Sequence, residues 1–215
     1  MNGFEADISR FERLAPRVVK ALEKRNFEAY YCKTLAEGAE KALSLIREGA
    51  TVSWGGSLTI VDSGLLDKVK SGNYKCIDRD TASNPAERTE LMRKALSADV
   101  FLTSFNAISE DGIIINTDGN GNRVAAITFG PQTVIALVGM NKIAKTEADA
   151  LVRARTIAAP RNAERLNRKT TGCAQSGTCQ NCLAPDCICA IIQTLRFSQK
   201  KGRIKIVLTA ESAGY

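Results

Sequence analysis

Apolar residues recur every three or four positions at the start of the chain, which is the spacing of one face of an α-helix. The residues on this face are Phe4, Ile8, Phe11, Leu14, Val18 and Leu22. They predict an amphipathic helix that Pro16 breaks or kinks, because proline has no N–H to donate inside a helix. Similar patterns predict helices at residues 35–47, 58–69, 85–97, 146–156, 161–168 and 190–197.

Short apolar runs between these helices predict strands. The predicted strands are residues 28–32, 51–54, 75–78, 100–103, 113–116, 124–129, 134–139 and 204–208. Strands that alternate with helices favour an α/β fold with three layers and a mostly parallel sheet. We divide the chain into an α/β domain at 1–168, a cysteine-rich metal-binding segment at 169–190, and a C-terminal helix and strand at 191–215 that return to the α/β domain.

The 215 residues include no histidine. This composition excludes Ser-His-Asp and Cys-His nucleophile systems, HExxH zinc sites and an imidazole general base. Proton transfer must then use Asp, Glu, Lys, Tyr or a cofactor. The first residues lack the pattern of a signal peptide, and no apolar run reaches the ~18 residues that span a bilayer. We therefore expect a cytoplasmic protein that does not enter a membrane.

The net charge of +7 is concentrated in the last third of the chain. Residues 1–150 hold 19 basic and 20 acidic side chains, whereas residues 151–215 hold 11 and 3. A basic tail is compatible with nucleic-acid binding, but no RNA-binding or zinc-finger motif accompanies it. We favour a role in balancing bound negative charge and do not expect nucleic acid as a partner.

Five of the seven cysteines lie within 17 residues. They are Cys173, Cys179, Cys182, Cys187 and Cys189. In a reducing compartment such a cluster is typical of metal binding or redox chemistry, and four thiolates suit an iron–sulfur cluster or a structural zinc. Cys187 and Cys189 are too close in sequence for both to bind easily, so one of them is not expected to be a ligand. The remaining two, Cys32 and Cys76, are predicted to be buried structural thiols.

Polar residues follow several predicted strands. Gly55, Gly56 and Ser57 form a turn that could bind an anion or simply connect a strand to a helix, with Ser57 as its cap. Asn141 and Lys142 follow the most apolar strand, where open α/β sheets bind ligands, although a plain helix start explains them equally well.

Acidic residues are also present in the turns at 106–112 and 116–123. By residue type, Glu110, Asp111 and Asp118 are the best candidates for a general base, and solvated turns are the alternative. The second turn is not an EF-hand loop, because the bidentate glutamate is missing.

Together these motifs resemble the lactate-utilisation (LUD) domain family. The matching stretches are residues 54–59, 104–112, 116–124, 130–143 and 153–163, and the similarity spans roughly residues 5–209. The cysteine tail resembles that of a short, single-domain branch of the family. The resemblance implies a fold like ribose-5-phosphate isomerase and the CoA transferases, with a cleft at the strand ends.

The resemblance also implies which cysteines bind the metal. The ligands would be Cys173, Cys179, Cys182 and Cys189, while Cys187 stands where a basic residue is commoner. From the residues themselves, we expect Glu110 and Asp118 as the catalytic groups. The expected ligand contacts are Gly55, Gly56, Ser57, Asn106, Asn122, Arg123, Asn141 and Lys142.

Three hypotheses about function follow. The first, which we favour, is a subunit or accessory of iron–sulfur-dependent oxidation of lactate or a related 2-hydroxy acid, with partner redox subunits. The second is an isomerase- or transferase-like enzyme acting on a phosphorylated or CoA-linked metabolite. The third is a non-catalytic metabolite-binding protein whose tail is held by zinc. All three imply a small anionic ligand, and a homo-oligomer is compatible with each.

Overall fold

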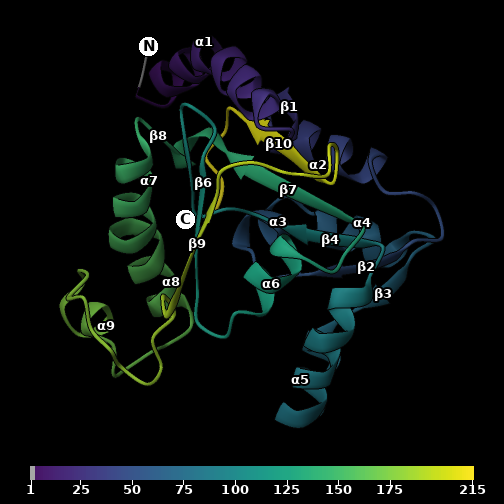
Figure 1. Ribbon diagram of the computed structural model, residues 1–215, viewed down its shortest axis with the longest axis vertical. Helices are drawn as coiled ribbons and strands as arrows, with labels where there is room; N and C mark the ends of the chain where they lie inside the picture. Colours follow the sequence, from purple (N-terminus) through teal and green to yellow (C-terminus); the bar gives the residue numbers. More distant parts are fainter. Residues whose placement is uncertain (1–2) are drawn as a thin grey trace.

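The computed structural model describes residues 3–215, and its centre is a six-stranded parallel sheet (Figure 1). The α/β domain predicted at 1–168 also includes residues 1–2, which lie outside the described part. The strands, in spatial order, are β1 (Glu28–Cys32), β10 (Ile204–Thr209), β7 (Thr133–Gly139), β4 (Val100–Thr103), β2 (Thr51–Trp54) and β3 (Lys75–Ile77). All neighbouring pairs in this sheet are parallel.

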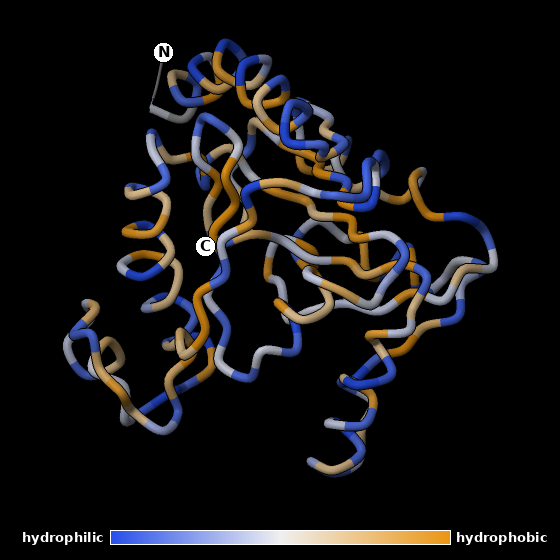
Figure 2. Tube along the Cα trace, in the orientation of Figure 1, coloured by the Kyte–Doolittle hydropathy of each residue, from blue (hydrophilic) through white to orange (hydrophobic). Residues whose placement is uncertain are grey.

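Helices cover both faces of this sheet. Successive residues of a strand point to opposite faces, so Val134, Ala136 and Val138 of β7 pack with α1 (Gly3–Lys24) in one core cluster. Ile135 and Leu137 instead belong to the cluster on the opposite face. That face is covered by α2 (Leu35–Ser44), α3 (Leu58–Asp62) and α4 (Leu65–Ser71). The apolar stretches lie along the strands and the inner turns of α1 (Figure 2). The three-layer, mostly parallel α/β fold predicted from the sequence is confirmed.

A second, smaller sheet extends the layer beside α1. Its strands are β8 (Ile143–Ala144), β5 (Ala107–Ser109), β6 (Ile114–Asp118) and β9 (Ile191–Leu195). β6 pairs antiparallel with both β5 and β9, and β5 pairs parallel with β8. The sheet packs against α7 (Glu147–Arg153), a helix that continues through a π-helical turn, η4 (Ala154–Ala158), into α8 (Ala159–Arg165).

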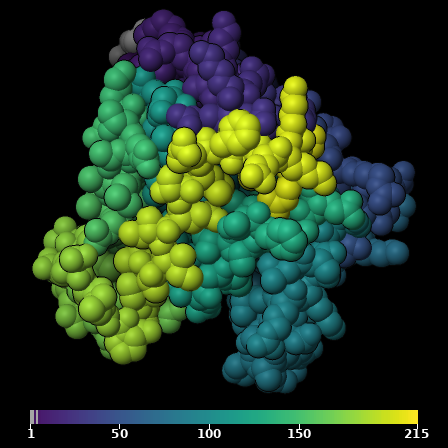
Figure 3. Space-filling model, viewed as in Figure 1, coloured from purple at the N-terminus to yellow at the C-terminus, as the bar shows by residue number. Residues whose placement is uncertain are grey.

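The remaining elements are short or peripheral. α5 (Pro85–Lys94) projects from the molecule without burying a side chain (Figure 1). The 3₁₀ turns are η1 (Arg79–Thr81), η2 (Ala95–Ser97) and η3 (Met140–Lys142). α9 (Gly172–Ser176) begins the cysteine-rich segment, which forms a lobe at the lower left of Figure 3.

Two predicted elements are wrong. The strand predicted at residues 124–129 is a helix, α6 (Asn122–Thr128), because Gly121, at φ +83°, turns the chain and its carbonyl accepts the first helical hydrogen bond. The helix predicted at residues 190–197 is strand β9, because pairing with the free edge of β6 satisfies its backbone.

Two residue-level expectations are also corrected. Pro16 does not break α1, which runs through it, because the burial of Ala15 and Val18 against the sheet outweighs one missing hydrogen bond. Cys76 is exposed rather than buried, because it lies on the edge strand β3.

Candidate functional site

A cavity of about 430 Å³ opens at the carboxyl ends of the parallel strands. Gly56 and Ser57 follow β2, Ser104 follows β4, and Lys142 follows β7. This edge is where open α/β sheets bind ligands, and the volume falls in the range of small-molecule sites.

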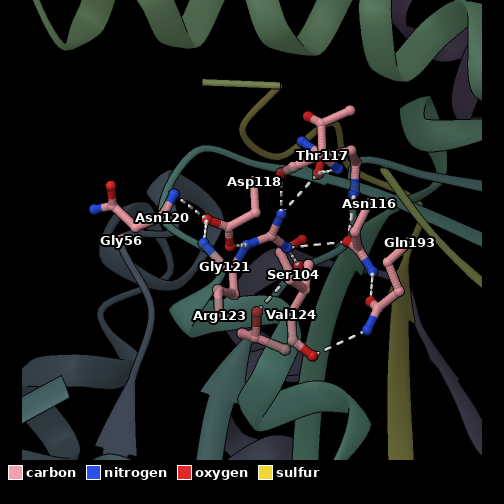
Figure 4. A network of polar contacts seen from close by, with 12 residues as sticks. Gly56, Ser104, Asn116, Thr117, Asp118, Asn120, Gly121, Arg123, Val124 and Gln193 are labelled. Carbon is pink, nitrogen blue, oxygen red and sulfur yellow. Dashed lines mark hydrogen bonds and ion pairs between the residues drawn. The ribbon is translucent and has the colours of Figure 1, made fainter. Parts of the chain in front are cut away.

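Arg123, the second residue of α6, organises the loops on one side of the cavity (Figure 4). Its Nη1 donates to the Ser104 carbonyl at 2.9 Å and to Asn116 Oδ1 at 3.0 Å. Its Nη2 donates to Asn106 Oδ1 at 2.8 Å and to the Thr117 carbonyl at 2.7 Å. These four bonds engage all four Nη hydrogens, so the guanidinium holds the loops in place instead of offering those donors to a ligand.

Asp118 belongs to the same network through its ion pair with Arg123. Its Oδ1 accepts from the backbone N–H groups of Asn120 and Gly121 at 3.1 and 2.9 Å, and its Oδ2 is 3.6 Å from Arg123 Nε. The carboxylate therefore stabilises a turn and an ion pair while it lines the cavity.

Lys142 lies on the cavity wall and is 3% exposed. Its Nζ donates to Thr59 Oγ1 at 2.8 Å and to Ser104 Oγ at 3.0 Å. Burial, together with the positive charges of Arg153 and Arg123, lowers the pKa of Lys142 to about 7. The amine is consequently close to half neutral at physiological pH.

The cavity is strongly basic. Five basic side chains line it, namely Arg79, Arg123, Lys142, Arg165 and Arg168, against two acidic ones, Asp118 and Asp186. Within residues 3–215, the buried Nε atoms of Arg79 and Arg168 have no hydrogen-bond partner. Arg165 Nη2 donates to the Gly56 carbonyl at 3.2 Å. The arrangement therefore attracts a small anion.

The cavity brings together most of the residues singled out from the sequence. Those that line it are Gly56, Ser57, Asn106, Asp118, Asn122, Arg123 and Lys142. Ser57 is the N-cap of α3, as expected, with Oγ accepting from the Ile60 N–H at 3.4 Å.

Three predicted site residues are not among those that line the cavity. Glu110 forms ion pairs with Arg17 at 3.2 Å and Lys145 at 2.9 Å, outside the lining of the cavity. Asn141 accepts from the Ala213 N–H through Oδ1, and Gly55 donates its N–H to the Leu102 carbonyl. Asp111, the other acidic candidate, pairs with Arg25.

Three arginines line this cavity that no sequence motif pointed to: Arg79, Arg165 and Arg168. Arg79 belongs to η1, after the edge strand, and the other two come from α8 and the loop after it. The concentration of basic residues after position 150 was the signal for Arg165 and Arg168, but no local pattern distinguishes Arg79.

A second cavity, of about 370 Å³, is lined by all five clustered cysteines. Arg155 Nη2 lies 3.9 Å from Cys179 Sγ, and the Gly172 N–H donates to Cys182 Sγ at 3.4 Å. The N–H groups of Gly172 and Ala184 lower the pKa of the Cys182 thiol. Cys187 Sγ and Cys189 Sγ are 3.3 Å apart, and burial followed by the Cys187 contact raises the pKa of Cys189 to about 12. In residues 3–215 no three His, Cys, Asp or Glu side chains are gathered closely enough to hold a metal ion.

The two cavities share a wall. Ala184, Cys187, Ile188 and Ala190 line both of them. Gly119, next to Asp118, packs against this wall so closely that a Cβ atom there would lie 3.0 Å from the Cys187 carbonyl oxygen. The basic cavity and the cysteine cavity are therefore adjacent.

Comparisons with known proteins identify the family and support the fold. The LUD domain matches residues 15–209, and the chain belongs to the LUD domain family. A crystal structure of a DUF162 family protein from Deinococcus radiodurans is similar to this chain, with a TM-score of 0.51 and 12% sequence identity. The match covers 92% of this chain and 96% of that one, and it supports the fold.

Partial structural similarity extends to two further proteins. The β subunit of eIF2B from Chaetomium thermophilum has a TM-score of 0.37 and 18% identity over 53% of this chain and 40% of that one. The δ subunit has a TM-score of 0.34 and 21% identity over 54% and 51%. No curated protein matches the sequence. Among residues 3–215, no helix is long and apolar enough to cross a membrane.

Proposed function

We propose that the protein binds a small carboxylate metabolite, a 2-hydroxy acid such as lactate or the corresponding 2-oxo acid, and acts as a component of its oxidation. The observation that carries this proposal is the excess of five basic over two acidic side chains around a cavity at the strand ends. Membership of the LUD domain family supports the lactate class of ligand.

The chain's own residues account for binding and orientation. Arg79, Arg165 and Arg168 line the cavity, and their positive charges attract a carboxylate that enters it. Arg123 keeps the Asn106 and Asp118 loops in a fixed shape, which lowers the conformational cost of binding.

The redox part of the proposal concerns the second cavity. Five thiols line one space, although no three of the described His, Cys, Asp or Glu side chains are gathered closely enough for a metal ion, so binding a cluster requires these thiols to move together. The N–H group that donates to Cys182 Sγ and the positive charge of Arg155 support an iron–sulfur cluster there. Such a cluster supplies one-electron transfer when bound. Cys173, Cys179, Cys182 and Cys189 would hold it, and partner redox subunits would carry the electrons onward.

Two measurements test this function. Calorimetric titration with lactate and pyruvate should show binding to the wild type, and Arg165→Gln should weaken it about tenfold through loss of one positive charge. Arg13→Gln removes an equal charge from α1, outside the cavity lining, and should leave the affinity unchanged. Failure of both acids to bind contradicts the carboxylate assignment.

Anaerobic purification followed by iron, sulfide and zinc analysis tests the cofactor. Iron with equivalent sulfide supports the cluster, whereas one zinc per chain without sulfide supports a structural staple. A phosphorylated metabolite is a second candidate, favoured by the three arginine side chains that line the cavity, Arg79, Arg165 and Arg168. Displacement of bound pyruvate by inorganic phosphate at lower concentration than by lactate would favour it.

A further inference from the structure

The proposed function leaves the chemistry of Lys142 unused. Its Nζ is buried at the cavity wall between the hydroxyl groups of Thr59 and Ser104. Gly214, at φ +58°, packs against Thr59 and Lys142, since a Cβ atom there would lie 2.5 Å from Thr59 Oγ1 and 3.3 Å from Lys142 Nζ. Thr59 Oγ1 in turn donates to the Ala213 carbonyl, so the amine is held from several sides.

The charges around this amine are mainly positive. Arg153, from α7, is fixed beside it because its Nε donates to the Asn141 carbonyl at 3.1 Å and its Nη1 to the Asn106 carbonyl. Arg123, from α6, adds a second positive charge, and Asp62, from α3, is the opposing carboxylate.

Burial beside other cations is the environment that turns a lysine into a nucleophile, because it disfavours the ammonium form. With a pKa of about 7 in place of 10.5, roughly a thousandfold more of the amine is neutral at pH 7. A lysine that served only to hold an anion would need the charged form, which an exposed side chain keeps more easily.

We propose that Lys142 Nζ attacks the C2 carbonyl of a 2-oxo acid bound in the basic cavity and forms an imine with it. This inference rests on the proposed function, because it assumes that the ligand is a carboxylate of this class. It adds a covalent reaction, imine formation, at Lys142 Nζ.

The step balances without an external oxidant or reductant. The nitrogen lone pair forms the N–C2 bond while the carbonyl π bond breaks and its oxygen takes a proton, giving a carbinolamine. The nitrogen then releases a proton, the C2–O bond breaks, and one water leaves, so that a C2=N bond remains. The Ser104 hydroxyl, 3.0 Å from Nζ, is placed to pass protons in this exchange.

Reductive trapping tests the proposal. The full-length protein is incubated with pyruvate and cyanoborohydride at pH 7, and the modified peptide is mapped by mass spectrometry. One reduced adduct per chain on Lys142 is expected, with a rate that rises through half-maximum near pH 7. Lactate has no carbonyl group, so it should give no adduct and should protect Lys142 from pyruvate.

Variants sharpen the test. Lys142→Gln should lose the adduct, while Lys145→Gln, which changes an exposed lysine three positions later, should keep it in full. Circular dichroism checks that both variants fold, and mapping of the wild-type adduct gives an answer even if Lys142→Gln does not fold.

The outcomes separate the two proposals. If calorimetry shows pyruvate binding but Lys142 carries no adduct, or if adducts are spread evenly over surface lysines, the imine is refuted and the proposed function stands. If pyruvate gives no adduct and neither pyruvate nor lactate binds, both are refuted.

Discussion

Replacement of Arg123 is the most direct test of how the site is built. The guanidinium satisfies four acceptors: the carbonyls of Ser104 and Thr117 and the side-chain oxygens of Asn106 and Asn116. A hydrogen bond to a charged group contributes about 1.5–3 kcal/mol. Simple addition overestimates the loss, because acceptors that face the cavity regain water when the side chain is shortened.

We therefore expect Arg123→Gln to lower the free energy of unfolding by about 3–5 kcal/mol, the usual result of breaking a buried charged network. Arg123→Lys should lose about 2–4 kcal/mol, because a single ammonium cannot reach both pairs of acceptors. Both variants should bind pyruvate more weakly than the wild type. Urea denaturation followed by circular dichroism measures the first effect and calorimetry the second.

Arg13→Gln is the matched control, since Arg13 is exposed and bonds only to Ser9 within its own helix in the contacts described. It should change stability by less than about 0.5 kcal/mol. A loss of less than about 1 kcal/mol in Arg123→Gln, with binding retained, would refute the idea that this side chain shapes the cavity.

Three further predictions concern other residues. The pKa of Lys142 is lower in the folded chain than its unfolded value of 10.5, so the unfolded chain binds more protons between these two values. The free energy of unfolding of the wild type should therefore rise by about 2 kcal/mol between pH 7 and 9. Urea titrations of Lys142→Met should lack this rise. Cys182→Ser should lower the iron and sulfide content of anaerobically reconstituted protein, whereas the exposed Cys76→Ser should retain it; equal content in both variants would remove Cys182 from the ligand set. Gly119→Ala should cost about 1–3 kcal/mol in urea unfolding, because its Cβ would press on the backbone of Cys187, and an unchanged midpoint would contradict this packing.

The strands of the central sheet were predictable because their residues form short runs of apolar side chains. The run from Val134 to Val138 is apolar at every position, as expected of a strand covered on both faces. Residues 124–129 form a short run that is apolar except at Thr128, and periodicity alone cannot distinguish a short helix from a strand there. The conformation of Gly121 decides between them, and it is visible only in three dimensions.

Part of the site was predictable because polar residues that come shortly after the central strands lie near the carboxyl edge of the sheet. Ser57 and Lys142 fall in the cavity for this reason. Glu110 does not, because the small strand β5 carries it toward α1 and its basic partners Arg17 and Lys145. Arg79 reaches the cavity from η1, next to Gly56, through packing that no sequence spacing encodes.

Ala184, Cys187, Ile188 and Ala190 line both cavities, so a group bound among the thiols that displaced these residues would also change the shape of the basic cavity. Any resulting coupling would be reciprocal: a ligand in the basic cavity would alter the affinity for that group by the same factor.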